Sequence, residues 1–190
     1  MADTKIEWAD KAWNPITGCS KISEGCQNCY AERMANRLKG RYGYPEDNPF
    51  EVTVHEDRLE EPLKWKKPSR VFVCSMGDLF HEEVDEGYLC RIFDIMVLEE
   101  KHSFMILTKR PERMKEFINR CVHGRLPKNI WLGVTAENQQ RADERIPILI
   151  QIPAAVRFVS IEPMLGPVDL TEERVSYCEM CGTVFDDPHY

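Results

Sequence analysis

Short apolar runs alternate along the chain with segments in which apolar residues recur every three or four positions. The runs cover residues 70–78, 104–108, 130–135 and 156–161. Continuous apolar runs of this length are typical of strands buried on both faces of a sheet. Between the first two runs, the spacing of a helix that packs on one side is given by Leu89, Ile92, Phe93, Met96 and Val97. This alternation predicts an α/β fold built from parallel βαβ units.

Three further segments carry helix signals. Tyr30, Met34 and Leu38 recur every four residues, and Gly40 or Gly43 ends the pattern. Pro111 suits the first turn of a helix, because that turn does not need the backbone N–H that proline lacks. A polar helix start follows the third apolar run, at residues 138–145.

Polar and small residues follow every predicted strand. Since parallel α/β proteins place ligands at the carboxyl ends of their strands, this pattern predicts one polar rim and favours a barrel or half-barrel. The rim residues are Ser75, Gly77 and Asp78; Thr108, Lys109 and Arg110; Thr135, Glu137 and Asn138; and Ser160 and Glu162.

The segment TGCSKISEGCQNCYAER places Cys19, Cys26 and Cys29 in one loop before the first helix. Thiolates are soft, anionic ligands, and three of them can hold three irons of a [4Fe–4S] cluster while the fourth iron stays open. Two alternatives remain at this point. The trio could bind zinc with a fourth ligand such as His55, or consist of plain thiols.

Four motifs in order, GCSKISEGCQNCYAERMANRL, RVFVCSMGDLFHEEV, FMILTKRPERM and VRFVSIEPMLGPVDL, resemble the radical S-adenosylmethionine superfamily. More closely, they resemble a phage- and prophage-associated family with a three-cysteine motif. The resemblance covers roughly residues 5–170. Its cysteine spacing is C-x6-C-x2-C, three residues longer in the first interval than the usual C-x3-C-x2-C of the superfamily.

The resemblance implies a partial (β/α) barrel of the TIM type over residues 1–170, incomplete at its C-terminal end. It implies that Cys19, Cys26 and Cys29 hold a [4Fe–4S] cluster and that S-adenosylmethionine binds at the rim. Ser75, Gly77 and Asp78 would receive the methionine amine, and Lys109 or Arg110 its carboxylate. Thr135, Glu137 and Asn138 would lie near the ribose, and Ser160 and Glu162 near the adenosine or the substrate. Thr108 is counted with the residues that bind the cofactor.

The chemistry implied by the resemblance is reductive cleavage of S-adenosylmethionine and abstraction of a substrate hydrogen, with an electron donor such as flavodoxin or ferredoxin. The likeness to a lesion-repair branch makes a nucleic acid or nucleotide the first substrate to consider. Two alternatives stay open: a zinc-stabilised binding protein without catalysis, and a degenerate scaffold that keeps only the cluster.

The remaining cysteines have other interpretations. Cys74, Cys90 and Cys121 lie in or beside apolar patterns and are expected to be buried thiols. Cys178 and Cys181 form a C-x-x-C knuckle in a separate tail, residues 171–190. This knuckle is half of a zinc ribbon, and both zinc and no metal remain open for it.

The net charge of −7 argues against attraction of nucleic acid or membrane to the whole surface. Basic residues nevertheless cluster locally, at Lys64, Lys66, Lys67 and Arg70, and at Lys109, Arg110, Arg113 and Lys115. The first residues lack the apolar stretch of a secretory signal, and the apolar segment 146–156 is too short to span a bilayer. We therefore expect a cytoplasmic protein without a membrane partner.

Overall fold

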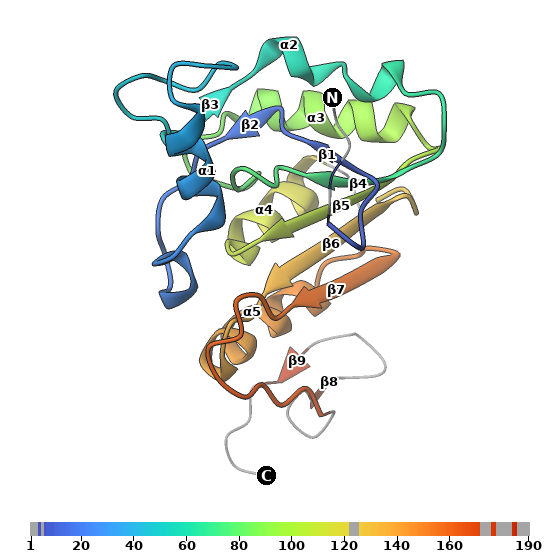
Figure 1. Cartoon of the computed structure of the whole chain (residues 1–190). Helices are drawn as coiled ribbons and strands as arrows, with labels where there is room; N and C mark the ends of the chain where they lie inside the picture. Colours follow the sequence, from blue (N-terminus) through green and yellow to red (C-terminus); the bar gives the residue numbers. More distant parts are fainter. Residues whose placement is uncertain (1–3, 5, 122–125, 172–175, 178–183, 186–190) are drawn as a thin grey trace.

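A five-stranded parallel sheet forms the centre of the computed structural model, which describes residue 4 and residues 6–121, 126–171, 176–177 and 184–185. Its strand order is β1-β4-β5-β6-β7, and every neighbouring pair is parallel (Figure 1). The strands are β1 (Lys11–Trp13), β4 (Arg70–Val73), β5 (Ser103–Thr108), β6 (Ile130–Thr135) and β7 (Val156–Ser160). The order in space follows the order in the chain, so each crossover leads to the next strand along.

Helices fill the crossovers between the strands. They are α1 (Tyr30–Leu38), α2 (Glu56–Leu59), α3 (Glu86–Leu98), α4 (Pro111–Cys121) and α5 (Gln139–Ile150), with 3-10 turns η1 (Glu24–Cys26) and η2 (Pro62–Lys64). Two small antiparallel pairs complete the described elements: β2 (Ile16–Thr17) with β3 (Thr53–Val54), and β8 (Ser176–Tyr177) with β9 (Val184–Phe185). No helix among the described residues combines the length and apolar character needed to cross a bilayer.

The main core lies between one face of the sheet and the helices α3, α4 and α5. Alternate strand residues such as Val73, Ile106 and Leu132 point into it and are fully buried. They meet the apolar sides of the helices, for example Ile92 on α3 and Phe117 on α4. Burial of such side chains from water stabilises the fold by roughly 1.5–3 kcal/mol each.

The structure confirms the predicted α/β class, the four predicted strands and the main helices. The helix around Leu89 extends over Glu86–Leu98, Pro111 opens α4, and Asn138 caps α5 by accepting a hydrogen bond from the N–H of Arg141. Two residues of the predicted apolar patterns are exposed: Val97, because the buried side of α3 ends at Met96, and Tyr30, because α1 buries Ala31 and Ala35. The sheet of the described residues is open and does not close into a barrel. Cys178 and Cys181, the predicted zinc knuckle, lie outside the described residues.

The cysteine loop lies at the carboxyl ends of the central strands. It runs from β2 through η1 to the start of α1, which stands beside the tips of the strand arrows (Figure 1). A parallel bridge joins Gly18 of this loop to Gly77, which follows β4. The cysteine loop is therefore attached to the carboxyl end of β4, the strand next to β1 in the sheet.

Candidate functional site

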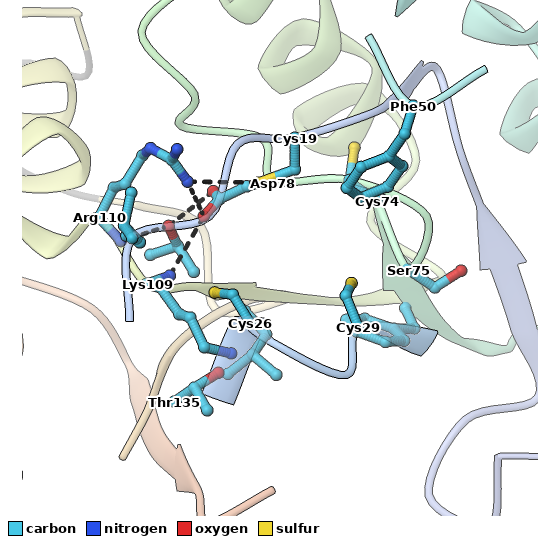
Figure 2. A pocket seen from close by; sticks show the side chains of 15 residues that line it. Cys19, Cys26, Cys29, Phe50, Cys74, Ser75, Asp78, Lys109, Arg110 and Thr135 are labelled. Carbon is cyan, nitrogen blue, oxygen red and sulfur yellow. Dashed lines mark hydrogen bonds and ion pairs between the residues drawn. The ribbon is translucent and has the colours of Figure 1, made fainter. Parts of the chain in front are cut away.

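A cavity of about 140 Å³ opens at the carboxyl ends of the strands, and Cys19, Cys26 and Cys29 all line it (Figure 2). Its wall also contains apolar side chains from Phe50 and Leu107. The complete lining is Cys19, Ile22, Cys26, Cys29, Phe50, Phe72, Cys74, Ser75, Gly77, Asp78, Leu107, Thr108, Lys109, Arg110 and Thr135. The fold thus gathers the three thiols of the loop around one space.

Glycine is required where the cysteine loop crosses its neighbours. Gly18 has a φ of +86°, and a Cβ atom there would lie 1.9 Å from the carbonyl oxygen of Glu51. The Gly18 N–H donates to the carbonyl of Met76 at 2.9 Å. A Cβ on Gly77 would in turn lie 2.7 Å from the Gly18 carbonyl oxygen. Both glycines therefore allow close backbone contact, which fixes the position of Cys19 over the end of β4.

A buried ion pair braces the other end of the loop. Glu137, fully buried after β6, accepts hydrogen bonds from the Ser23 hydroxyl and, at 2.8 Å, from the Arg145 guanidinium. Burial by itself would raise the pKa of Glu137, but the hydrogen bond from Ser23 and the charge of Arg145 lower it. A second, exposed pair joins Glu24 to Arg141 at 3.0 Å. The segment of the long C-x6-C interval that precedes Cys26 is thus held against α5.

Asp78 connects the ends of β4 and β5 through a carboxylate that accepts four hydrogen bonds. Its Oδ1 accepts from the Thr108 hydroxyl at 2.7 Å and from the Phe80 N–H at 3.0 Å. Its Oδ2 accepts from the Lys109 N–H at 3.2 Å and from the Arg110 guanidinium at 3.1 Å. Because each oxygen already has two donors, Asp78 orients the rim residues around it.

Arg110 links this carboxylate to the first cysteine. Its Nη1 lies 3.4 Å from the Cys19 sulfur, its Nε donates to Glu82 at 2.7 Å, and its Nη2 donates to the Ser20 hydroxyl at 2.8 Å. Burial and the neighbouring charge of Asp78 raise the pKa of the Cys19 thiol to about 11, against the opposing effect of Arg110. Without a metal, Cys19 is therefore a neutral thiol at pH 7.

Cys26 has a different environment. Burial would raise the pKa of its thiol, but hydrogen bonds from the Ile22 backbone and from Ser23, together with the charge of Lys109, lower it. The Lys109 side chain extends across the cavity toward Cys26 and Thr135 (Figure 2). In the described part of the chain it forms no ion pair with a carboxylate. Lys109 is thus a cation of the cavity wall that is available to an anion.

Ten of the predicted site residues line the cavity. They are Cys19, Cys26, Cys29, Ser75, Gly77, Asp78, Thr108, Lys109, Arg110 and Thr135. Glu137 and Asn138 are not part of the cavity wall: Glu137 accepts a hydrogen bond from Ser23, and Asn138 caps α5, and their predicted place near the ribose stays a prediction. Ser160 is the last residue of β7 and Glu162 follows the strand; neither is part of the cavity wall, so their predicted roles stay predictions.

Several residues of the site were not predicted from the sequence. Phe50 comes from an irregular segment, and its carbonyl accepts a hydrogen bond from the Cys19 N–H at 3.2 Å. The Asn14 side chain accepts from the Ser75 hydroxyl and from the Met76 N–H. Neither position has a periodic pattern around it, and only the path of the chain in space brings them to the site.

The other predicted thiols and ligands are also placed. Cys74 is buried at the cavity wall, and burial raises the pKa of its thiol to about 12. Cys90 and Cys121 are half-buried and pack against the main core. His55, considered as a fourth zinc ligand, is buried with its Nε2 2.8 Å from the Thr17 hydroxyl and is not part of the cavity wall. Among the described residues, no group of three or more His, Cys, Asp and Glu side chains is placed to hold a single ion.

Comparison with known proteins gives one family. The family described as "Protein of unknown function (DUF5131)" matches residues 3–182. No curated protein and no solved structure matched the chain in the corresponding comparisons.

Proposed function

The chain belongs to the DUF5131 family of proteins of unknown function, so its activity has to be inferred from the site, and we propose that it is a radical S-adenosylmethionine enzyme. In this proposal Cys19, Cys26 and Cys29 hold a [4Fe–4S] cluster. The observation that carries the proposal is the arrangement of three thiols from one loop around a single cavity at the carboxyl ends of parallel strands. Substrates of parallel α/β enzymes bind at that end of the sheet.

The donor set and the space suit a cluster. Thiolates are the ligands of iron–sulfur clusters, and the three sulfurs border a cavity of about 140 Å³ rather than converging as the ligands of one ion. A zinc ion needs its sulfur ligands at about 2.3 Å, and no group of three or more such ligands converges in this way among the described residues. The hydrogen bond from Gly18 to Met76 and the one from Ser23 to Glu137 fix the loop at two points, one before Cys19 and one before Cys26.

The topology favours a relationship with (β/α) barrels. In the described sheet, successive strands are neighbours and all are parallel, and α3, α4 and α5 pack on the same face. A doubly wound sheet reverses direction at a switch point and carries helices on both faces, whereas a (β/α) barrel winds in one direction. We propose that the five strands are part of such a barrel.

The side chains of the cavity wall divide the remaining tasks. Lys109 is the cation that we assign to the methionine carboxylate, because Arg110 is already paired with Asp78 and Glu82. Arg110 instead donates to the Cys19 sulfur, and hydrogen bonds to ligand sulfurs tune the potential of iron–sulfur clusters. Phe50, Phe72 and Leu107 give the wall an apolar part that limits the access of water.

The bound cofactors would supply one-electron reduction and hydrogen abstraction, which no side chain of the cavity can perform by itself. The protein's own contribution is to hold the three thiols, to position the cavity wall through Asp78, and to present Lys109, which has no ion pair with a carboxylate among the described residues. The contacts of the described residues support each of these tasks.

Anaerobic purification tests the proposal. We expect brown protein that contains iron and sulfide and forms 5′-deoxyadenosine from S-adenosylmethionine after reduction with dithionite or flavodoxin. A Cys26→Ala variant should lose the colour and the product. Cys121→Ala is the matched control, because this thiol packs on the core away from the cavity, and its iron content should equal that of the wild type.

Two outcomes would overturn the proposal in different ways. Zinc in place of iron and sulfide, in oxygen-protected protein, would support a zinc-stabilised binding protein. Iron and sulfide without any 5′-deoxyadenosine, with each reductant, would support a scaffold that keeps the cluster only for structure or electron transfer.

A further inference from the structure

The outer side of α1 carries an unusual combination of cations and aromatic rings. Tyr30, Arg33 and Arg37 are spaced by three and four residues, so they share one side of the helix. The opposite side is apolar, and Ala31 and Ala35 are buried there. The exposed side continues past the helix end, where the Arg41 guanidinium donates to the Arg37 carbonyl. The α1 face consists of Tyr30, Arg33, Arg37, Lys39, Arg41 and Tyr42, all exposed.

In the described part of the chain, none of the four cations of this face forms an ion pair with a carboxylate. The Glu46 carboxylate nevertheless lies beside Gly40, where a Cβ would be 2.4 Å from its Oε2. The nearest acid in sequence, Glu32, is paired with Lys21 at 2.9 Å. Four cations within nine residues repel one another, in a chain whose net charge is −7. A bound polyanion would relieve that repulsion.

The basic clusters expected from the sequence are partly engaged in internal contacts, although Lys64, Lys66 and Lys67 are exposed. Arg70 pairs with Asp10 at 3.2 Å, and Arg110 pairs with Asp78 and Glu82. The Arg113 and Lys115 side chains donate to the Val84 carbonyl and to Gln151. The α1 face differs from these clusters because it combines its cations with two exposed tyrosine rings, so it is the better candidate for a surface that binds bases as well as phosphates.

The aromatic rings indicate what kind of anion fits. The exposed fraction is 61% for Tyr30 and 75% for Tyr42, so both rings are open to solvent. A helix dipole accounts for a cation in the last turn, such as Arg37, but it does not account for Arg33 or for two exposed rings. Guanidinium groups bind phosphates in a bidentate manner, and exposed aromatic rings stack on unpaired bases. A single-stranded nucleic acid offers both groups, whereas the bases of a duplex are already stacked.

The position of the α1 face relates it to the cavity. Tyr30 directly follows Cys29, which lines the cavity, so the face begins at the cavity mouth. Arg33 and Arg37 continue from there, about 6 Å apart along the helix axis. A nucleic-acid strand that lies along this face would pass the cavity, and its bases would be accessible there.

We propose that the α1 face binds single-stranded nucleic acid through its phosphates and bases, and that this strand carries the substrate of the cavity. The first part, the binding of nucleic acid to this surface, is inferred from the exposed cations and aromatic rings alone. The second part, the delivery of a nucleotide to the cavity, rests on the proposed function.

Fluorescence anisotropy with a labelled oligonucleotide of roughly 12 nucleotides tests the binding surface on the full, anaerobically purified chain. Arg33→Gln combined with Arg37→Gln should weaken binding at least about tenfold at about 50 mM salt and reduce the slope of log affinity against log salt by about 1.4. Tyr30→Leu should weaken binding roughly fivefold or more, because stacking is lost while the apolar bulk stays. The matched control is Lys64→Gln with Lys67→Gln, two exposed cations elsewhere, and its affinity should equal that of the wild type.

An independent measurement avoids the variants. Ultraviolet crosslinking of a bromouridine oligonucleotide to the wild-type chain, followed by peptide mapping, should label residues 30–43. Equal affinity of the wild type and the double-arginine variant would overturn the proposal. Equal or stronger binding to duplex DNA, or to phosphatidylserine vesicles, would overturn it as well.

Different experimental results would reject the proposed function and the proposed binding surface. Oligonucleotide binding by a protein that holds zinc and forms no 5′-deoxyadenosine would retain the surface and reject the proposed function. Formation of 5′-deoxyadenosine by a protein that binds no oligonucleotide would do the reverse.

Discussion

Replacement of Glu137 by alanine is expected to be the most damaging single change in the brace of the cysteine loop. Glu137 is fully buried, and its partner Arg145 is nearly so. After the substitution, the Arg145 guanidinium keeps only the Thr135 carbonyl, to which it donates at 2.7 Å. Ser23 loses its buried acceptor at the same time. An unpaired charge would then remain in the interior, next to the loop that carries Cys26.

The magnitude follows from the burial of both partners. Removal of one partner of a buried ion pair costs about 3–5 kcal/mol, mainly because the remaining charge stays desolvated. For a chain of 190 residues, this loss of unfolding free energy lowers the melting temperature by roughly 6–20 °C. The exposed pair of Glu24 and Arg141 is worth much less, below about 1 kcal/mol, because water screens it.

Thermal unfolding followed by circular dichroism measures the difference. Glu24→Ala is the matched control, since it removes a carboxylate that braces the same loop from the surface. The pair Glu137→Leu with Arg145→Met should recover most of the loss, because no unpaired charge remains. If Glu137→Ala unfolds at the same temperature as Glu24→Ala, the buried ion pair does not brace the loop.

Gly18→Ala should destabilise the fold by about 2–4 kcal/mol in a urea titration, because the residue has a φ of +86° and the new Cβ would meet the Glu51 carbonyl; a loss within about 0.5 kcal/mol would contradict the described loop path. His55 gives a pH dependence: burial lowers its pKa to about 4, so the unfolded chain binds more protons below the ordinary pKa of 6.5. Its contribution to the unfolding free energy is therefore complete above pH 6.5 and is lost as the pH falls through 4, about 3 kcal/mol in total, and His55→Gln should remove this part of the pH slope. Lys109→Ala should weaken equilibrium binding of S-adenosylmethionine at least about tenfold without a change in iron content, whereas the exposed Lys128→Ala should bind normally. An unchanged affinity in the Lys109 variant would assign the carboxylate to another group.

The elements could be predicted because their signals are local. The apolar runs and the helical spacing around Leu89 depend only on neighbouring residues, and the structure confirms both. The strand-end rule also placed Asp78, Thr108 and Lys109 correctly at one cavity, since parallel strands present their carboxyl ends together.

The roles of the individual site residues could not be predicted from local sequence patterns. The sequence assigns Lys109 and Arg110 equally to an anionic ligand, but the structure pairs Arg110 with Asp78 and Glu82 and keeps Lys109 unpaired in the described part of the chain. The sequence also places Glu137 at the ligand rim, whereas the structure buries it against Ser23. Each of these contacts joins residues 28 or more positions apart, so no local pattern records them.

The sequence by itself determined the α/β class, the order of the strands along the chain and the presence of three thiols in one early loop. Periodicity and spacing encode these features, because a strand or a helix depends on the residues next to one another. Only the tertiary structure decided that the three thiols surround one cavity, which cations are neutralised and which remain exposed on α1. Such facts depend on which distant side chains the packed sheet brings within a few ångströms of each other, and that distance is set by the whole fold.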